Sequence, residues 1–356
     1  MTEPTGNTGR TSGTHGIRGT HVAGTTGETA GGNGRRTLLR AAVAGAGALG
    51  AAAAGAPAAG AATGAAERAG GRSGPPTFVF VHGAGANSAS WQPVVAEMGI
   101  RGHRAVAVDL PGHGWQAYVP ASYQAPQDPE RLRTEPSPLT KVTLDDFADH
   151  VEAVVRRVRR NGPVVLVGQS MGGVTVNAVA NRVPELLAHL VYASAFCPTK
   201  HPTVVSLAFT PENAGSALFS IPAVPTPPEL GVNRVNWRSN DPAVFRAAKL
   251  ALAADYPDEE IRMLMSLLEP DESAAIGATD ARGLPDRWGR VPRTFLRFTE
   301  DRSIPLPLQD LMIREADETT PGNRFRVRSF AAPHIGPRDP GVLAAELERI
   351  ALLCRS

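Results

Sequence analysis

Cysteine is scarce in this chain of 356 residues, which contains only Cys197 and Cys354. Two cysteines cannot build a disulfide scaffold or a cysteine-rich metal site. A single disulfide between them remains an alternative. Because Cys197 lies at the end of a predicted apolar strand, a buried free thiol is the preferred interpretation.

The body of the chain also lacks a large excess of positive or negative charge. There are 36 basic and 34 acidic side chains, but seven Arg and only three acidic residues fall within residues 1–74. The basic excess therefore belongs to the N-terminal segment, and acidic residues slightly outnumber basic ones in the rest of the chain. Since nucleic-acid binding depends on clustered positive charge, nucleic acid is not expected as a partner.

A strongly apolar run that could span a membrane is missing as well. Residues 41–66 carry no charge, but 16 of these 26 residues are Ala and six are Gly, which bury too little apolar surface for a stable span. Arg35 and Arg36 precede this stretch, and small residues near 56–61 offer cleavage sites. The pattern is typical of a twin-arginine export signal.

Residues 1–74 are therefore predicted to be a disordered N-terminus that contains this signal. The expected consequences are a transient contact with the twin-arginine translocation machinery, no stable membrane anchor, and an extracellular or cell-envelope location. The alternative is a disordered Ala/Gly tail on a cytoplasmic protein.

The body of the chain alternates short apolar runs with amphipathic stretches. Strands are predicted at residues 77–81, 104–108, 163–167, 189–195, 294–298 and 324–330, and helices at 88–98, 142–160, 171–183, 308–316 and 341–353. This alternation predicts an α/β fold with a mostly parallel central sheet and helices on both faces. Ligands of such sheets bind at the carboxyl ends of the strands.

Almost a hundred residues without a clear strand interrupt the pattern, which is too long for a loop in a compact domain. Residues 199–290 are predicted to form an inserted helical cap, with helices beginning near 242 and 257, and residues 75–198 and 291–356 to form the core. Five apolar residues of the cap are pocket candidates, although simple packing is the plainer interpretation of each: Leu207, Phe209, Leu218, Phe219 and Ile221.

The most informative motif is Gly168-Gln169-Ser170-Met171-Gly172, which lies between an apolar strand and a predicted helix. Glycines on both sides let strand and helix approach closely around a sharp turn that exposes the serine. The helix N-terminus supplies backbone N–H groups that can stabilise an oxyanion. Ser170 is therefore the predicted nucleophile, and Met171 supplies one predicted oxyanion donor.

A base and an acid follow the last two predicted strands of the core. His334 is the only histidine after residue 201, and it lies in a short loop after the last strand. Asp301 follows the strand at 294–298 and is the predicted orienting acid, with Glu300 as the neighbour that could replace it. The order Ser170, Asp301, His334 is that of the Ser-His-Asp machinery of hydrolases of this architecture.

The loop after the first strand, His82-Gly83-Ala84-Gly85, is expected to provide the second oxyanion donor from Ala84. His82 and His113 lie in Gly-rich turns and are predicted to hold loops or to line the pocket. Three residues are further candidates for substrate contacts: His82, Gly83 and Gln169.

With these motifs the chain resembles the α/β-hydrolase superfamily over about residues 76–354. Within it, Val81 to Gly85 with Trp91, the Val165–Gly173 segment and Asp301 to Gln309 resemble the plant methyl esterases and hydroxynitrile lyases and their bacterial relatives. The resemblance implies Ser170, Asp301 and His334 as a triad with Ala84 and Met171 as oxyanion donors. It also favours Asp301 over Glu300.

Two departures from the lyases favour ester hydrolysis. Where the lyases have a threonine and a lysine, this chain has Gly83 and Ile335. The esterases usually have His-Ser-Pro where this chain has His334-Ile335-Gly336, so the alcohol side of the pocket is expected to differ. The hypothesis is a serine hydrolase of small to medium apolar carboxylic esters that uses no metal or cofactor. The alternatives are a lyase with the same triad and a non-catalytic binding protein.

Overall fold

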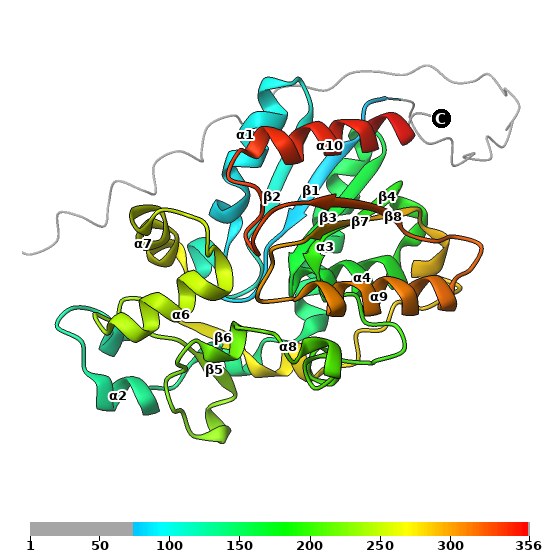
Figure 1. The fold of residues 1–356 in the computed structure, drawn as a ribbon. Helices are drawn as coiled ribbons and strands as arrows, with labels where there is room; N and C mark the ends of the chain where they lie inside the picture. Colours follow the sequence, from blue (N-terminus) through cyan, green and yellow to red (C-terminus); the bar gives the residue numbers. More distant parts are fainter. Residues whose placement is uncertain (1–73, 355–356) are drawn as a thin grey trace, which may run out of the picture. The chain divides into compact units, whose positions relative to one another are not determined.

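The computed structural model describes residues 74–354, which form the fold shown in Figure 1. The predicted export segment lies outside the described residues. The six strands of the central sheet are β1 (Thr77–Val81), β2 (Arg104–Val108), β3 (Val164–Ser170), β4 (His189–Ala195), β7 (Arg293–Phe298) and β8 (Arg326–Phe330). They lie in the order β2-β1-β3-β4-β7-β8, and every neighbouring pair is parallel.

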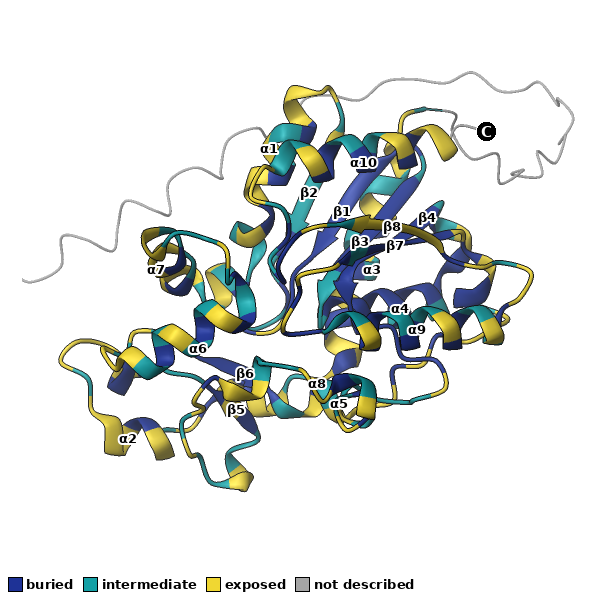
Figure 2. Ribbon diagram, in the orientation of Figure 1, coloured by how far each residue is buried: buried dark blue, intermediate teal, exposed yellow. Residues whose placement is uncertain are grey.

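Helices cover both faces of this sheet. One face packs against α1 (Gln92–Ile100) and α10 (Pro340–Leu353), and the other against α3 (Leu144–Val158), α4 (Gly172–Arg182) and α9 (Leu306–Thr319). The inner strands are buried along their whole apolar length, as the dark blue ribbon in Figure 2 shows. The predicted α/β class with a parallel sheet between helical layers is therefore confirmed.

The beginning of α3 illustrates how local sequence fixes an element. Thr143 accepts a hydrogen bond from the Asp146 backbone, and the Asp146 side chain accepts one from the Thr143 backbone, which completes a capping box. Phe147, Val151 and Val155 follow at helical spacing and are buried against the sheet. The predicted helix at 142–160 thus begins at Leu144, directly after the capping residue.

The insertion, as residues 199–290 are called below, contributes no strand to the central sheet. It contains α5 (Val204–Ala208), α6 (Pro242–Leu252), α7 (Asp258–Leu267) and α8 (Ala274–Ala278), together with a two-stranded antiparallel sheet of β5 (Val232–Arg234) and β6 (Asp271–Ser273). The expectation that this segment lacks strands is thus wrong, because three-residue strands are too short for a periodic signal.

A buried ion pair explains why so short a sheet forms. Arg234 of β5 makes a bidentate contact with Asp271 of β6, and both side chains are buried. The same guanidinium donates to the backbone carbonyl of Leu132, which lies within α2 (Pro129–Thr134), and to that of Glu135, the C-cap of this helix. The Arg234 side chain therefore also binds the long loop before α3 to the insertion.

Between residues 74 and 354, none of the helices combines the length and the apolar character needed to cross a bilayer.

Candidate functional site

Ser170 is the last residue of β3 and has a φ of 53°, in the left-handed region that non-glycine residues rarely adopt. The register between β3 and β4 shifts at this point, so the strand ends in a sharp turn into α4. A Cβ on Gly168 would lie 2.7 Å from Val176 Cγ2, and one on Gly172 would lie 2.6 Å from the His82 carbonyl oxygen. Only glycine at both positions permits this close approach.

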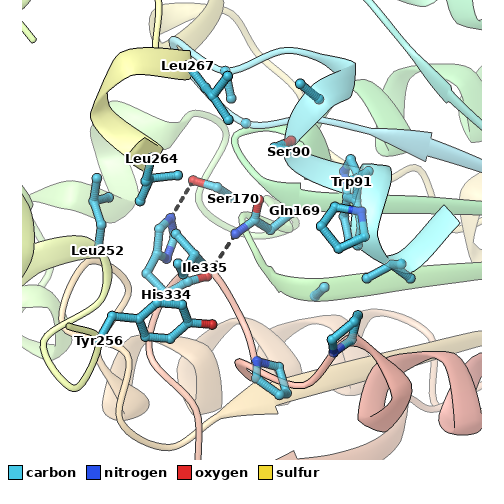
Figure 3. A pocket seen from close by; sticks show the side chains of 18 of the residues that line it. Ser90, Trp91, Gln169, Ser170, Leu252, Tyr256, Leu264, Leu267, His334 and Ile335 are labelled. Carbon is cyan, nitrogen blue, oxygen red and sulfur yellow. Dashed lines mark hydrogen bonds between the residues drawn. The ribbon is translucent and has the colours of Figure 1, made fainter. Parts of the chain in front are cut away.

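His334 meets Ser170 from the loop that follows β8. Its Nε2 lies 3.0 Å from Ser170 Oγ, and His334 is buried, with 5% of the residue exposed. The side-chain amide of Gln169 donates to the His334 carbonyl at 2.8 Å (Figure 3). The Ile335 N–H donates to the carbonyl of Leu252 at 3.1 Å. These two bonds hold the loop against the end of β3 and against α6.

Asp301 follows β7 and completes the hydrogen-bonded chain. Its Oδ2 lies 2.7 Å from His334 Nδ1 and also accepts the hydroxyl proton of Ser194, while Oδ1 accepts the backbone N–H groups of Ser303 and Ile304. The Ser194 hydroxyl and the two backbone N–H groups are donors, so the Asp301 oxygens serve as acceptors, and Oδ2 is placed to accept from His334 Nδ1 as well. His334 then carries its proton on Nδ1 and presents the lone pair of Nε2 to Ser170.

The loop after β1 lies against Ser170 on another side. A Cβ on Gly83 would come within 2.8 Å of Ser170 Cβ, so only glycine fits there without displacing the serine. Ala84 follows at the wall of the pocket, and Met171 is the N-cap of α4. The first N–H groups of a helix have no partner within it, so the Met171 N–H is one of these open donors.

An apolar cavity of about 340 Å³ opens beside Ser170 and His334. Its walls come from the segment before and within α1, from α6 and α7 of the insertion, and from the loop after β8 (Figure 3). The larger apolar side chains that line it are Trp91, Leu252, Tyr256, Met263, Leu264, Leu267, Leu268, Phe298, Ile335 and Leu343. Polar side chains at its walls include Glu260 and Arg338, which form an ion pair with each other.

A match to the family model described as the alpha/beta hydrolase family covers residues 78–346. The chain belongs to the alpha/beta hydrolase family. Methylesterase 1 of Arabidopsis thaliana is 25% identical over 243 residues, which are 66% of this chain and 82% of that protein. A pyrethroid hydrolase of Sphingobium wenxiniae is 23% identical over 67% of this chain and 75% of its own length.

A solved structure has a similar fold. The crystal structure of a pyrethroid hydrolase from Sphingobium faniae superposes with a TM-score of 0.59 at 20% identity, covering 78% of this chain and 97% of the other. The resemblance to the superfamily and to plant methylesterases, inferred from the motifs, is thus confirmed.

The placement of the predicted substrate contacts in this alpha/beta hydrolase is mixed. Gly83 and Gln169 line the cavity. His82 does not, because it is only 1% exposed and its ring is used within the loops, with Nδ1 2.9 Å from the Gly83 carbonyl and Nε2 accepting the Leu110 N–H at 3.1 Å. The expectation that His82 also contacts substrate is therefore not met by its position.

The apolar pocket candidates of the insertion were also misplaced. None of the five belongs to the residues that line the cavity. Leu207 is buried in the same apolar core as residues of α4 and α9, while Phe209 and Phe219 are mostly exposed. The insertion residues that line the cavity lie on or next to α6 and α7. The helical spacing of apolar residues in the sequence shows that these helices have an apolar face, but not which part of the molecule that face covers.

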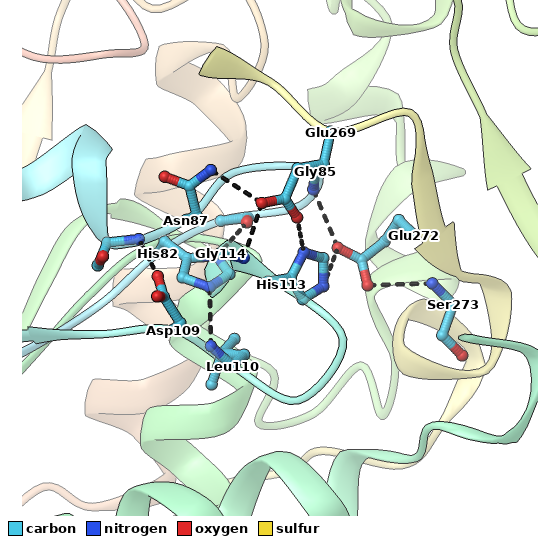
Figure 4. A network of polar contacts seen from close by, with 12 residues as sticks. His82, Gly85, Asn87, Asp109, Leu110, His113, Gly114, Glu269, Glu272 and Ser273 are labelled. Carbon is cyan, nitrogen blue, oxygen red and sulfur yellow. Dashed lines mark hydrogen bonds and ion pairs between the residues drawn. The ribbon is translucent and has the colours of Figure 1, made fainter. Parts of the chain in front are cut away.

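Sequence reasoning missed a buried ionic network next to this site. His113 Nδ1 lies 2.7 Å from Glu269 Oε2, and His113 Nε2 lies 3.6 Å from Glu272 Oε2 (Figure 4). Burial alone would lower the pKa of His113, but hydrogen bonds with Glu269 and Glu272 raise it to about 10. Burial, and then the charge of nearby His113, lowers the pKa of His82 to about 4.

Both cysteines are free, and Cys197 is buried. Burial raises the pKa of the Cys197 thiol to about 12, so this side chain is a packing residue rather than a reactive thiolate.

Proposed function

We propose that this chain is a serine hydrolase of carboxylic esters, with Ser170 as nucleophile, His334 as base and Asp301 as the orienting acid. The observation that supports it most is the continuous hydrogen-bonded chain from Asp301 through His334 to Ser170 at the wall of an apolar cavity. The names of the relatives, methylesterase and pyrethroid hydrolase, also favour ester hydrolysis.

In the first half of the proposed reaction, His334 Nε2 accepts the Ser170 hydroxyl proton as Oγ attacks the carbonyl carbon of the ester. The carbonyl electron pair moves onto oxygen, and the N–H groups of Ala84 and Met171 stabilise the resulting oxyanion. As the tetrahedral intermediate collapses, His334 gives its proton to the departing alkoxide. The alcohol leaves, and an acyl group remains on Ser170.

Water completes the cycle in the second half. His334 accepts a proton from water as the water oxygen attacks the acyl carbon, and it returns that proton to Ser170 Oγ when the carboxylic acid is released. Asp301 stays ionised throughout and stabilises the imidazolium that forms twice per cycle. No step requires a metal or an organic cofactor.

The cavity favours neutral apolar esters of small to medium size. A volume of about 340 Å³ falls in the range of sites for compact organic molecules. The charged side chains at its walls, Glu260 and Arg338, neutralise each other, so no unpaired charge is offered to an ionic substrate. Gly83 and Ile335 stand where the cyanohydrin-cleaving relatives carry threonine and lysine, and this further favours hydrolysis over a lyase reaction.

The decisive experiment compares the rates at which residues 74–354 and their Ser170→Ala variant hydrolyse p-nitrophenyl esters from acetate to decanoate. We expect the wild type to hydrolyse the series and the variant to lose at least about 10³-fold in kcat/KM. Equal rates for both proteins would reject Ser170 as nucleophile. If neither protein hydrolysed any ester while a fluorophosphonate still labelled Ser170, a narrower substrate or a lyase reaction would replace this proposal.

We also propose export by the twin-arginine route, which rests on Arg35, Arg36 and the uncharged stretch at residues 41–66. This route would give an extracellular or cell-envelope esterase without a stable membrane anchor.

A further inference from the structure

A buried ionic cluster joins the insertion to the two loops that follow β1 and β2. It consists of His113, Glu269 and Glu272, and is called the His113 cluster below (Figure 4). His113 is fully buried, and the two glutamates are each less than 9% exposed. His113 Nδ1 is hydrogen-bonded to Glu269, while Nε2 faces Glu272 at 3.6 Å, an ion-pair distance beyond that of a hydrogen bond. Two carboxylates on opposite sides of the ring stabilise the imidazole in its doubly protonated, charged form. The proposed reaction does not use any of these groups directly.

The Glu272 carboxylate and the Glu269 backbone hold one residue of the oxyanion loop by both of its backbone groups. Glu272 Oε2 accepts the N–H of Gly85 at 3.0 Å, and the backbone N–H of Glu269 donates to the carbonyl of Gly85 at 2.8 Å. Gly85 directly follows Ala84 and has a φ of 59°. Fixing both of its peptide groups restricts rotation on the C-terminal side of Ala84.

Glu269 anchors the flanks of the same loops. Its Oε1 accepts the side-chain amide of Asn87 and the backbone N–H of Gly114, both at 2.8 Å. Asn87 lies three residues beyond Ala84, and Gly114 follows His113. The cluster therefore binds the end of the β1 loop and the start of the next loop to a single short segment of the insertion.

We propose that Glu272 is a positioning residue for the oxyanion donor Ala84, acting through the N–H of Gly85, with His113 as its buried counterion. The proposal rests on the proposed function, since it assumes that the Ala84 N–H stabilises an oxyanion. Preorganised donors act strongly only where they are held in place, because a donor displaced by a fraction of an ångström loses much of its effect.

The chemistry around Glu272 requires a carboxylate rather than an amide. Its Oε2 meets the Gly85 N–H and His113 Nε2, and its Oε1 accepts the N–H of Ser273 at 3.1 Å. All three neighbours are donors when His113 is charged. A glutamine would have to turn its NH₂ group toward at least one of them, which would push that donor away.

Other groups around His113 do not compete for its proton. The ring of His82 lies edge-on with its centre 5.0 Å away, and the low pKa of His82 keeps it uncharged near neutral pH. Phe147 packs on another side at 5.9 Å. Glu269 and Glu272 are thus the charged partners that face this imidazolium.

The test compares Glu272→Gln with Glu229→Gln, a substitution at an exposed site of the same insertion. Steady-state hydrolysis of p-nitrophenyl butyrate gives kcat and KM. Intact-mass spectrometry gives the rate at which a fluorophosphonate labels Ser170. The labelling reaction is a second probe because it also develops negative charge on an oxygen in the oxyanion site. We expect Glu272→Gln to lower kcat and the labelling rate roughly 10- to 100-fold with KM changed less than threefold. Glu229→Gln should match the wild type.

Glu272→Gln rates equal to those of the control would overturn the proposal, as would a rise in KM with kcat unchanged. If the wild type failed to hydrolyse the ester, the proposed function would be in question, but slower labelling in Glu272→Gln alone would still support the positioning role. An unlabelled wild-type Ser170 would reject both. Should Glu272→Gln not fold, Glu272→Asp keeps the charge beside His113 but shortens the reach to Gly85, and the same drop is expected.

Discussion

At the scale of single residues, the hydrogen bonds that the Asp301 carboxylate accepts fix its position beside His334. Its two oxygens accept four hydrogen bonds, from Ser194, His334, Ser303 and Ile304. Glu300, the neighbour considered as an alternative acid, is exposed, with its backbone N–H bonded to Ala332. The geometry therefore favours Asp301 as the residue that orients His334.

Replacing Asp301 with asparagine should abolish most of the activity. The asparagine NH₂ group would face donors, and His334 would lose the acceptor that keeps its proton on Nδ1. We expect kcat to fall about 10³- to 10⁴-fold. Hydrolysis of p-nitrophenyl butyrate measures this, with Glu300→Gln as the matched control at the adjacent carboxylate. A larger loss in Glu300→Gln than in Asp301→Asn would reverse the assignment.

At the scale of elements, α7 sets the far wall of the cavity. Leu264 projects toward Ser170 from this helix and is only partly buried (Figure 3). Leu264→Ala removes three carbon atoms from the wall, so the preferred acyl chain should lengthen by about two carbons. Two additional buried methylenes correspond to a gain of roughly tenfold in the kcat/KM ratio of decanoate to butyrate.

The matched control on α7 is Ser266→Ala, since Ser266 is exposed and does not line the cavity. It should leave the chain-length profile unchanged. Leu264→Phe should shift the preference toward shorter esters. An unchanged profile in both Leu264 variants would mean that the acyl chain binds elsewhere.

The elements of the core could be predicted because their signals are local. Buried parallel strands read as uninterrupted apolar runs, and the predicted bounds of β1, β2 and β4 are those observed. The turn at Ser170 could be predicted from its flanking glycines. The places of Asp301 and His334 could be predicted because each follows an apolar strand. The fold class and the meeting of these three side chains followed from the order of strands.

What could not be predicted depends on contacts between distant segments. Glu269 and Glu272 have no periodic pattern that distinguishes buried acids from exposed ones, and His113 meets them across more than 150 residues of sequence. The apolar residues chosen for the pocket, such as Phe209 and Phe219, proved exposed because the path of the insertion is set by tertiary packing and by the buried pair of Arg234 and Asp271.

At the scale of the whole molecule, the two buried histidines shape stability against pH. His113 binds its proton more tightly in the folded state, so its contribution is complete below pH 6.5 and is lost as the pH rises through about 10. His82 has a lowered pKa, so its contribution is complete above pH 6.5 and is lost as the pH falls toward about 4. Together they favour maximum stability near pH 6.5.

Urea unfolding of the wild type and His113→Gln at pH 6.5, 8 and 9.5 tests this dependence. The difference in free energy of unfolding between the two proteins should shrink as the pH rises, by up to about 1.4 kcal/mol per unit. A constant difference across this range would show that His113 is not charged in the folded protein.

Export concerns the molecule as a whole and has a direct test. The double variant Arg35→Lys, Arg36→Lys should stay in the cytoplasm of a host with a twin-arginine pathway, while Arg40→Lys should be exported like the wild type. Immunoblots of the cytoplasmic fraction, the cell envelope and the medium measure the distribution. Unaltered export of the double variant would exclude this route.

The backbone at Ser170 carries a further consequence for how the protein tolerates change. A serine held at a φ of 53° costs on the order of 1–3 kcal/mol, which is a sizeable part of the net stability of a domain. Packing of the surrounding sheet and helices must offset this free-energy cost, which leaves less net stability to absorb destabilising mutations. Mutational robustness in this protein is therefore limited from the outset by the turn that exposes the proposed nucleophile, and Ser170→Gly should yield a more stable protein without esterase activity.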